Sequence, residues 1–402
     1  MINKESNPID KDLLEQYEYR IERLSYYMDK LIKLHNDIVD LAWSGDTELK
    51  KYVCMQPFNK IYVDENGIVS PCCLYRIKYG AYFGNTNSHS FDEIWNSDNA
   101  KRLRYSVAKG NFEYCDRACP VLKSPAANKD VMFQRESVKF NYSTWHDCTV
   151  DTGPTYVNVG CDSTCNLHCP SCRGKRRERG HVSSDEKNLK INEILENIVR
   201  PALKNCEWLQ AIGSGEFFAS KSVQEFFKTL TKKEFPLLKL IIMTNGLLFT
   251  PERWQKLSNL KGMVDIVKVS VDAAEKETYE RIRRGGHWET LCENMDYVSS
   301  LKASGDIKRI QMNFVVQKGN FKQMGDFVRL AKKWNVDKVN FTRLRNWGTF
   351  SNKEFKDSDV FLPENPFYNE AVSILQSLLR EKETIISEAG LLTVGREDEY
   401  AI

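Results

Sequence analysis

The sequence contains no long apolar run and no strong excess of charge. No apolar segment approaches the length of a membrane span, and the opening residues MINKESNPIDKD are too polar for a secretory signal peptide. The net charge of +3 is too small for 402 residues to indicate binding to nucleic acid or to an anionic membrane. Internal repeats and low-complexity tracts are also absent. We therefore expect a globular, cytoplasmic protein with no membrane partner and no nucleic-acid partner.

Cysteine, by contrast, is plentiful, with 12 residues in the chain. Thiols in a reducing compartment such as the cytoplasm are not usually paired as disulfides. Several of these cysteines stand in tight clusters along the sequence. Ligation of a metal ion or of an iron–sulfur cluster is therefore the leading interpretation.

Changes of composition divide the chain into five expected segments. Apolar residues at three- and four-residue steps predict a helical segment, and short stretches rich in Gly, Asn and Cys predict a small metal-stapled module. Prolines mark a connector, and one helix is expected in the C-terminal extension. The expected ranges are 1–50 for the helical segment, 51–123 for the cysteine-rich module, 124–154 for the connector, 155–350 for the main domain and 351–402 for the extension.

The main domain alternates between apolar and amphipathic segments. Six apolar segments are expected to form buried strands, with amphipathic helices between them. This alternation predicts a parallel sheet, either a barrel or an open doubly wound sheet, and six units are fewer than the eight of a full barrel. The expected strands are 156–160, 208–212, 238–243, 264–271, 309–316 and 338–344.

The strongest motif is CNLHCPSC, which follows the first of these strands. It places Cys165, Cys169 and Cys172 in a C-x3-C-x2-C array on one loop. Three thiolates on a tight loop can each bind one iron of a cubane cluster and leave the fourth iron open, whereas four thiolates complete the set. The alternative is a structural zinc site, since C-x2-C spacing is typical of zinc and Cys161 is available as a fourth ligand.

Four further motifs follow the second to fourth strands, and the functional groups of a parallel barrel gather where its strands end. Glycines allow close approach of the backbone to a ligand, and an acidic residue pairs with a cation. The motifs are GSGE (Gly213, Ser214, Gly215 and Glu216), TNG (Thr244, Asn245 and Gly246), SVD (Ser270, Val271 and Asp272) and TYERIRRGG (278–286).

Taken in this order, the motifs resemble those of the radical S-adenosylmethionine (SAM) superfamily over about residues 156–345. The resemblance implies an α/β fold, a partial (β/α)6 TIM-type barrel, with a [4Fe–4S] cluster on Cys165, Cys169 and Cys172. It also implies that SAM binds the open iron and is cleaved reductively to a 5′-deoxyadenosyl radical, which abstracts a substrate hydrogen. Ser171 stands where the family often has an aromatic residue, at a position that does not ligate the cluster.

The same resemblance implies a set of SAM contacts. The GSGE motif corresponds to backbone and carboxylate groups that receive the SAM ammonium, and Ser270 and Asp272 match positions that bind the ribose. Arg283 or Arg284 is expected to pair with the SAM carboxylate. The implied SAM-binding residues are Gly213, Ser214, Gly215, Glu216, Thr244, Asn245, Ser270, Asp272 and Arg283.

The cysteine-rich module resembles the SPASM domain, an auxiliary iron–sulfur module whose signature opens C-x9–15-G-x4-C. In this sequence twelve residues separate Cys54 from Gly67 and four separate Gly67 from Cys72. The module departs from the family pattern because it precedes the barrel and has fewer late cysteines. A four-cysteine zinc site is the alternative. The resemblance implies one auxiliary [4Fe–4S] cluster on Cys54, Cys72, Cys115 and Cys119, with Cys73 as a substitute for Cys72.

Three functions are weighed, two of which follow from these resemblances. The favoured one is an oxidoreductase or peptide-modifying enzyme that crosslinks, epimerises or oxidises a ribosomally made peptide. The alternative is a dehydrogenase or epimerase of a sugar, an aminoglycoside or another small polyol, and the remote alternative is a non-catalytic zinc-binding scaffold. The expected partners are a peptide or small-molecule substrate and an electron donor such as flavodoxin or ferredoxin.

Overall fold

The computed structural model describes residues 49–72, 77, 81–116, 119–123, 125–172, 184–211 and 214–380. The expected N-terminal helical segment lies almost entirely outside the described residues. Two compact units are formed. The described residues of the smaller unit fall within Met1–Met55, Tyr75–Ala81 and Lys101–Cys148, and those of the larger unit within Gln56–Leu74, Tyr82–Ala100 and Thr149–Ile402. In the part of the chain that is described, no helix is both long and apolar enough to cross a membrane.

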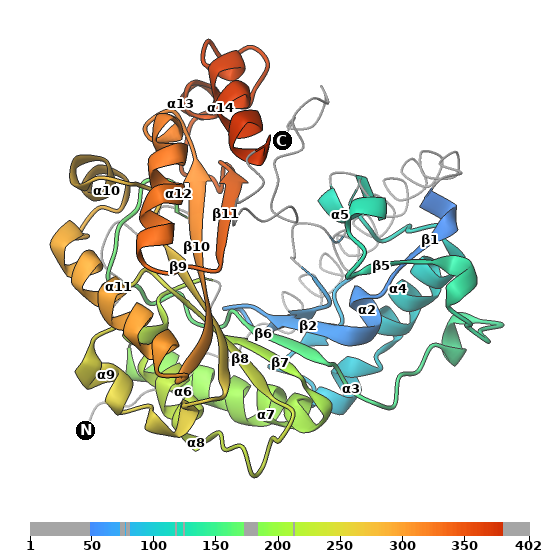
Figure 1. The fold of residues 1–402 in the computed structure, drawn as a ribbon. Helices are drawn as coiled ribbons and strands as arrows, with labels where there is room; N and C mark the ends of the chain where they lie inside the picture. Colours follow the sequence, from blue (N-terminus) through green and yellow to red (C-terminus); the bar gives the residue numbers. More distant parts are fainter. Residues whose placement is uncertain are drawn as a thin grey trace, which may run out of the picture. The chain divides into compact units, whose positions relative to one another are not determined.

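The larger unit is built on a nine-stranded sheet of order β11-β10-β9-β8-β7-β6-β2-β3-β4 (Figure 1). Neighbouring strands from β11 to β2 are parallel. The six predicted strands are all present, and the α/β class with a partial (β/α)6 barrel is confirmed. They are β6 (Tyr156–Val159), β7 (Trp208–Ala211), β8 (Lys239–Thr244), β9 (Val264–Ser270), β10 (Ile307–Val316) and β11 (Lys338–Arg343).

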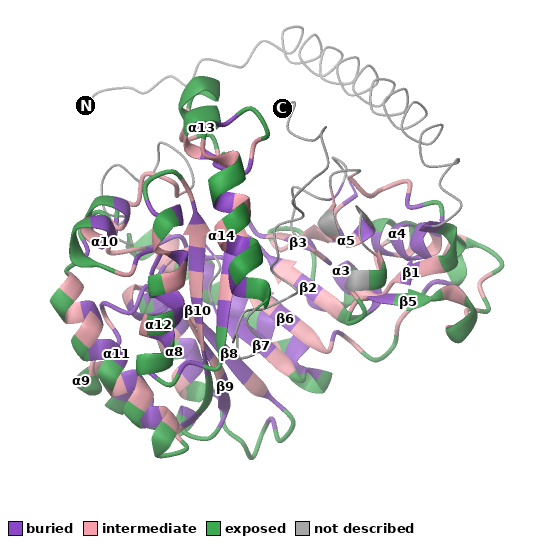
Figure 2. Cartoon of the chain, turned by 45° about the horizontal axis from the view of Figure 1, so that its top comes forward, coloured by how far each residue is buried: buried purple, intermediate pink, exposed green. Residues whose placement is uncertain are grey.

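Helices cover one face of these strands, and α8, α11 and α12 lie along it in Figure 1. Their amphipathic sequences bury one side and expose the other (Figure 2), as in α12, where Met324, Phe327 and Val328 are buried. The helices of this unit are α2 (Gln56–Asn59), α3 (Phe91–Trp95), α6 (Asp185–Ile194) continued by the π-helix η7 (Leu195–Val199), α7 (Arg200–Ala202), η8 (Leu203–Asn205), η9 (Phe217–Ala219), α8 (Lys221–Thr229), α9 (Pro251–Gln255), η10 (Ser258–Leu260), α10 (Lys276–Ile282), α11 (Trp288–Ala303), η11 (Phe321–Gln323), α12 (Met324–Lys333), α13 (Asn352–Ser358) and α14 (Tyr368–Arg380). The expected C-terminal helix is α14.

The opposite face of the sheet is polar, and we call it the concave face. Successive side chains of a strand point to opposite faces. On β9, Val267 and Val269 are fully buried, whereas Lys268 and Ser270 between and after them are only partly buried. Strands β10 and β11 alternate in the same way, and their side chains on the concave face include Gln311, Asn313 and Asn340.

The sheet extends into residues that the sequence analysis grouped with the cysteine-rich module. Strand β2 (Lys60–Val63) pairs in parallel with β6, and β3 (Ile68–Ser70) and β4 (Gly84–Asn85) continue the sheet in antiparallel register. The turn between β2 and β3 requires Gly67, which has a φ of 79° and whose added Cβ would lie 2.2 Å from Thr86 Oγ1. These strands are too short for periodicity alone to link them to the barrel.

The smaller unit contains a two-stranded antiparallel sheet of β1 (Tyr52–Cys54) and β5 (Met132–Gln134). Two arginines tie its segments together: Arg104 is fully buried and donates to the Cys148 carbonyl, and Arg135 donates to the carbonyls of Lys50, Ala108 and Tyr52. Its other elements are η1 (Leu49–Lys51), most of α4 (Asp98–Lys109), α5 (Pro120–Lys123), η3 (Pro125–Ala127), η4 (Arg135–Ser137) and η5 (Trp145–Asp147).

Candidate active site

The loop that follows β6 carries the three cysteines of the C-x3-C-x2-C motif. Its backbone is held by hydrogen bonds from Cys172 N to the Cys169 carbonyl (3.1 Å) and from His168 N to the Arg284 carbonyl (2.9 Å). The amide of Leu167 lies 3.5 Å from Cys165 Sγ. The loop is therefore docked on the segment that follows α10, and its cysteines are partly buried.

The thiols of this loop lie in a protected environment and interact electrostatically with one another. Burial raises the pKa of Cys165 to about 11, and the charges of Glu216, Cys169 and Cys172 add to the shift. Burial also raises the pKa of Cys169, against the opposing effect of Arg283. A bound cation or cluster would be needed to keep these thiols ionised near neutral pH.

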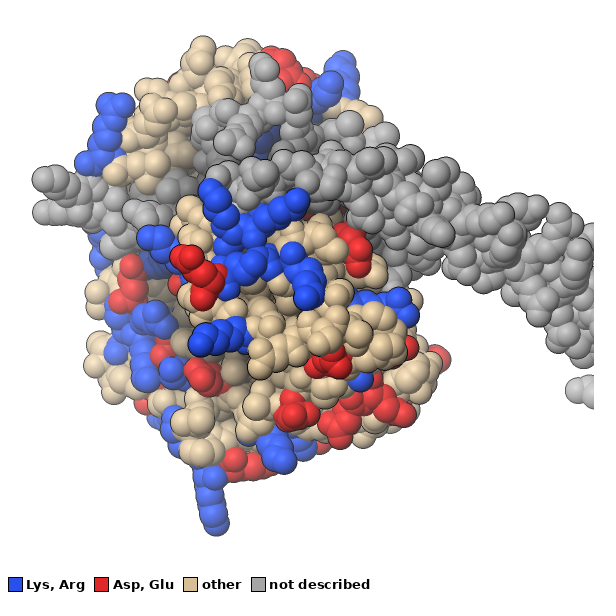
Figure 3. Space-filling view, turned by 90° about the vertical axis from the view of Figure 1, so that its right-hand side faces the viewer, with Lys and Arg blue, Asp and Glu red and all other residues tan. Residues whose placement is uncertain are grey.

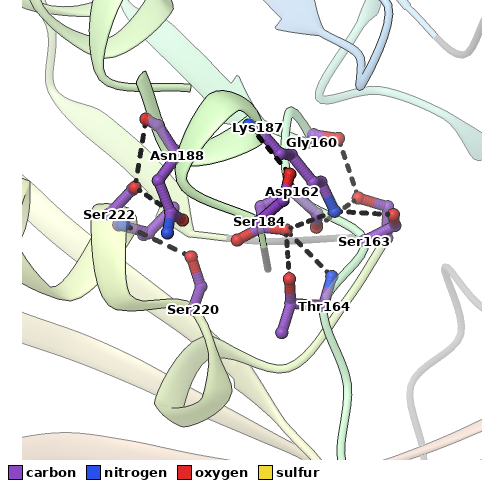
Figure 4. Close-up of polar contacts among 11 residues, drawn as sticks. Gly160, Asp162, Ser163, Thr164, Ser184, Lys187, Asn188, Ser220 and Ser222 are labelled. Carbon is purple, nitrogen blue, oxygen red and sulfur yellow. Dashed lines mark hydrogen bonds and ion pairs between the residues drawn. The ribbon is translucent and has the colours of Figure 1, made fainter. Parts of the chain in front are cut away.

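A cluster of polar residues anchors the start of this loop (Figure 4). Asp162 is fully buried, and its carboxylate lies 3.0 Å from Lys187 Nζ on α6 and accepts from Thr164 N and Oγ1. Burial opposes ionisation of Asp162, but hydrogen bonds to its carboxylate and the charge of Lys187 outweigh this effect and lower its pKa. The Ser214 hydroxyl donates to the carbonyls of Gly160 and Asp162. The loop after β7 is thus fastened to the base of the cysteine loop.

Gly215 is required by the same contact between loops. A Cβ added to Gly215 would lie 2.5 Å from the carbonyl oxygen of Thr164 and 2.7 Å from that of Asp162. The Glu216 amide also donates to the Thr164 carbonyl (2.8 Å). The sequence analysis expected the glycines of GSGE to approach a ligand, and the structure assigns Gly215 to a close approach between backbones. Gly213 lies outside the described residues.

Glu216 is buried at the end of β7, and its carboxylate is fixed by the loop after β8. One oxygen accepts from Thr244 Oγ1 (2.7 Å) and Phe218 N (3.1 Å), and the other from Asn245 N (2.6 Å). Burial raises the pKa of Glu216, although these hydrogen bonds oppose the shift. Asn245 in turn places its side-chain nitrogen 3.9 Å from Cys165 Sγ. The GSGE and TNG motifs therefore meet beside the cysteine loop.

Asp272 and Arg283 form a buried ion pair on the other side of the loop. Arg283 Nη2 lies 2.7 Å from the Asp272 carboxylate, and Arg283 Nη1 lies 3.8 Å from Cys169 Sγ. Asp272 has a φ of 64°, in the left-handed region that Asp tolerates better than most residues, and also accepts from Val315 N (2.8 Å). The two residues expected to contact different parts of SAM are thus paired with each other. Ser270 lies two residues before Asp272, on the concave face.

The site fits the cofactors that the sequence motifs imply. Among the described residues, two buried donors next to Cys169 have no acceptor: Arg283 Nε and the Tyr279 hydroxyl. An anionic group such as the SAM carboxylate would satisfy them. Over the described ranges, no three His, Cys, Asp or Glu side chains are placed to hold a single metal ion. A four-iron cluster makes a different demand, because each thiolate binds its own iron.

The expected auxiliary ligands are distributed over both units. Cys54, Cys115 and Cys119 belong to the smaller unit and Cys72 to the larger, and all four are partly buried. Cys54 ends β1, Cys115 N donates to the Phe112 carbonyl (2.9 Å), and Ser70 Oγ donates to the Cys72 carbonyl (2.7 Å). Cys73, the expected substitute, lies outside the described residues.

The functional side chains of the concave face were not predicted from the sequence. Lys268 on β9 and Gln210 on β7 lie on this face, and their charge and amide groups are within 3.5 Å of each other. The signal was present in the sequence, since a charged residue alternates with Val267 and Val269 in an otherwise apolar strand.

Two family models match the chain. One, the SPASM iron-sulfur cluster-binding domain, matches residues 54–120, and the other, the radical SAM superfamily, matches residues 163–331. The first model contains the four proposed auxiliary cysteines, and the second contains the cysteine loop and the four motifs described above. Because the SPASM model describes an iron–sulfur cluster-binding domain, iron–sulfur clusters are favoured over the zinc sites that the sequence alone also allowed.

Curated relatives are similar to about half of the chain. The GTP 3′,8-cyclases of Limosilactobacillus fermentum and Peptoclostridium acidaminophilum are 26% and 27% identical over 208 and 218 residues, each 52% of this chain. The AdoMet-dependent heme synthase of Methanosarcina barkeri is 31% identical over 122 residues, 30% of this chain and 31% of that protein. The chain spans 59% and 63% of the length of the two cyclases.

Two solved structures were found to be similar to parts of the chain. SuiB of Streptococcus suis bound to its precursor peptide SuiA is 11% identical, with 84% of this chain and 71% of that chain covered and a TM-score of 0.43. The enzyme anSMEcpe with bound AdoMet and Kp18Cys peptide is 16% identical, with 57% and 63% covered and a TM-score of 0.37.

Proposed function

The chain belongs to the radical SAM superfamily and carries a SPASM domain ahead of its barrel, and on this premise we propose that it cleaves SAM reductively to modify a ribosomally made peptide. The two domains imply three cofactors: a [4Fe–4S] cluster, SAM and an auxiliary iron–sulfur cluster. The observation that carries the proposal is the meeting of Glu216, Asn245 and Arg283 at the cysteine loop.

We assign the radical SAM cluster to Cys165, Cys169 and Cys172, and the auxiliary cluster to Cys54, Cys72, Cys115 and Cys119. When bound, the cluster and SAM supply a 5′-deoxyadenosyl radical, formed with methionine by one-electron reduction, which takes a hydrogen atom from the substrate. An electron donor such as flavodoxin or ferredoxin would deliver that electron. Four cysteine ligands leave no open iron on the auxiliary cluster, which favours electron transfer over substrate binding.

The remaining residues would bind and orient SAM. Glu216 is held in one orientation by three donors and offers a buried carboxylate to the SAM ammonium. Arg283 is oriented by Asp272 and offers its unpaired Nε to the SAM carboxylate. Because both side chains are fixed before the ligand arrives, little conformational entropy is lost on binding.

The SPASM domain supports a peptide substrate, because the radical SAM enzymes that this sequence resembles commonly combine such a domain with the modification of peptides. A peptide substrate is also supported by the concave face, where Gln311, Asn313 and Asn340 present side-chain amides that can both donate to and accept from peptide groups. The small-molecule alternative predicts instead that polyols or sugars stimulate SAM cleavage.

The experiment is anaerobic purification followed by reduction with dithionite in the presence of SAM. We expect a brown protein with about eight irons and eight sulfides if both clusters are four-iron cubanes, and release of 5′-deoxyadenosine. The triple variant C165A/C169A/C172A should lose 5′-deoxyadenosine release and about half of its iron. The matched control C292A changes a cysteine on α11 and should retain both. A colourless protein, or 5′-deoxyadenosine from the triple variant, contradicts the assignment.

A further inference from the structure

Lys268 occupies the middle of the concave face, two residues before Ser270 on β9. The sheet register places it opposite Met243 of β8 on one side and opposite Gln311 of β10 on the other. Ser270 stands one pair further along, opposite Asn313. Ser270 is expected to contact the SAM ribose. Lys268 lies on the same face of the sheet two residues earlier in β9, where a substrate bound next to SAM would reach.

Among the described residues, the charge of Lys268 has no counterion. Its Nζ lies 3.5 Å from Gln210 Oε1, which already accepts a 2.6 Å hydrogen bond from the Tyr156 hydroxyl. Within the described part of the chain, no carboxylate forms an ion pair with Lys268. A partly buried ammonium with one weak acceptor is costly, and it gives the site an affinity for an anion.

Other cations add to the positive potential at this place. Burial lowers the pKa of Lys268 to about 8, and the nearby charges of Lys60, Lys338 and Arg309 contribute to the shift. These three come from β2, β11 and β10, and Arg309 is itself paired with Asp265. On the surface, Figure 3 shows Lys and Arg side chains gathered at the centre of one face of the molecule. Around Lys268, the excess of positive charge comes from Lys60, Lys338 and Arg309.

Amide groups surround this ammonium on the neighbouring strands. Gln311 Nε2 donates to Asn313 Oδ1 (2.7 Å), and Asn340 Nδ2 lies 3.3 Å from the same oxygen. On β6, the side-chain oxygen of Asn158 is buried and has no donor among the described residues. Amides of this kind match the N–H and C=O groups of a peptide backbone.

We propose that Lys268 binds a carboxylate of the substrate, the side chain of an Asp or Glu residue in the peptide, while the amides of Gln311, Asn313 and Asn340 bind the adjoining peptide groups. This inference rests on the proposed function and narrows its substrate to an acidic peptide segment. A carboxylate fits because one ammonium can neutralise one carboxylate. Recognition of a phosphate group more often uses planar guanidinium donors, and Arg309, whose charge acts on Lys268, is engaged by Asp265.

The test measures binding of two pooled heptapeptide libraries that differ only in the central residue, Glu in one pool and Gln in the other. Full-length wild-type protein should bind the Glu pool at least about tenfold more tightly, as one charge-assisted hydrogen bond predicts. K268M should lose this preference, and K268R should keep most of it because the charge remains. K268Q replaces K268M if the latter does not fold.

The matched control is K256M, which removes an exposed cation at the end of α9, outside the concave face. It should change the preference by less than about twofold, because exposed charges are screened by solvent. A loss in K256M equal to that in K268M indicates diffuse electrostatics and overturns the inference. Equal binding of both pools by the wild type overturns the inference but leaves a peptide substrate standing. Binding of GTP or pyrophosphate that depends on Lys268, with no binding of either pool, overturns both the inference and the peptide proposal.

Discussion

The guanidinium of Arg283 lies 2.7 Å from the carboxylate of Asp272 and 3.8 Å from the sulfur of Cys169, so one side chain links the end of β9 to the cysteine loop. Asp272 is buried and Arg283 is largely buried, with side-chain exposures of 3% and 14%. This arrangement makes Arg283 a positioning residue for the loop as well as a candidate SAM ligand.

R283M should therefore destabilise the protein even without cofactors. Removing one partner of a buried ion pair leaves the other charge unpaired and costs about 3–5 kcal/mol. The measurement is urea denaturation of the apoprotein, with K276A as the control because Lys276 forms an exposed pair with Glu289. We expect no measurable change in K276A. An R283M variant as stable as the wild type would show that the pair does not hold the loop.

G215A tests the close approach between the loops after β6 and β7. An added Cβ meets two backbone carbonyls at 2.5 and 2.7 Å, and backbone atoms cannot rotate away as a flexible side chain can. We expect a loss of about 2–3 kcal/mol in unfolding free energy and reduced iron content after reconstitution. The control is G325A on α12, where the Cβ has space and Ala should stabilise the helix by up to about 1 kcal/mol. Equal stability of G215A and the wild type contradicts this reading of the structure.

The parts of the site that could be predicted from sequence are those encoded within a single strand and the loop after it. Apolar runs such as 264–271 mark β9, and the cysteine spacing marks the loop after β6. The Asp272–Arg283 pair could not be predicted, because it depends on a positive φ at Asp272 and on where α10 ends. Contacts between loops that follow different strands, such as the close approach of Gly215 to the Thr164 carbonyl, also produce no periodic pattern in the sequence.

The attachment of β2 to β6 could not be predicted for a related reason. A four-residue strand carries only two buried side chains, Ile61 and Val63, which is too little to distinguish a sheet member from a turn in a cysteine-rich region. The concave face illustrates the opposite case. The alternation of apolar and polar residues could be read from VKVS of β9. Whether Lys268 faces the helices or the opposite side of the sheet depends on which face the helices cover, and this the sequence does not tell.

E216Q should weaken both SAM binding and the fold. The carboxylate accepts three hydrogen bonds, and in the amide one nitrogen must face a donor, which costs about 1–3 kcal/mol of stability. The lost charge–charge contact with the SAM ammonium should lower SAM affinity about tenfold. Isothermal titration of the reconstituted protein with SAM measures this change, and E225Q on the exposed side of α8 is the control. Unchanged SAM affinity in E216Q would remove Glu216 from the proposed SAM site.

K268M should make the protein more stable, and the gain should depend on pH. The pKa of Lys268 is about 8 in the folded protein against an ordinary value of 10.5, so the folded protein releases this proton at lower pH than the unfolded chain does. Stability of the wild type therefore rises with pH between about 8 and 10.5, and the cost of the buried charge is fully present below that window. At pH 7 the gain in K268M should be on the order of 1–3 kcal/mol. It should shrink as the pH approaches 10.5, whereas K256M, at an exposed lysine of α9, should leave stability nearly unchanged at each pH. A K268M variant less stable than the wild type at pH 7 would mean that Lys268 stabilises the sheet, and the case for an anion-binding lysine would lose its physical basis.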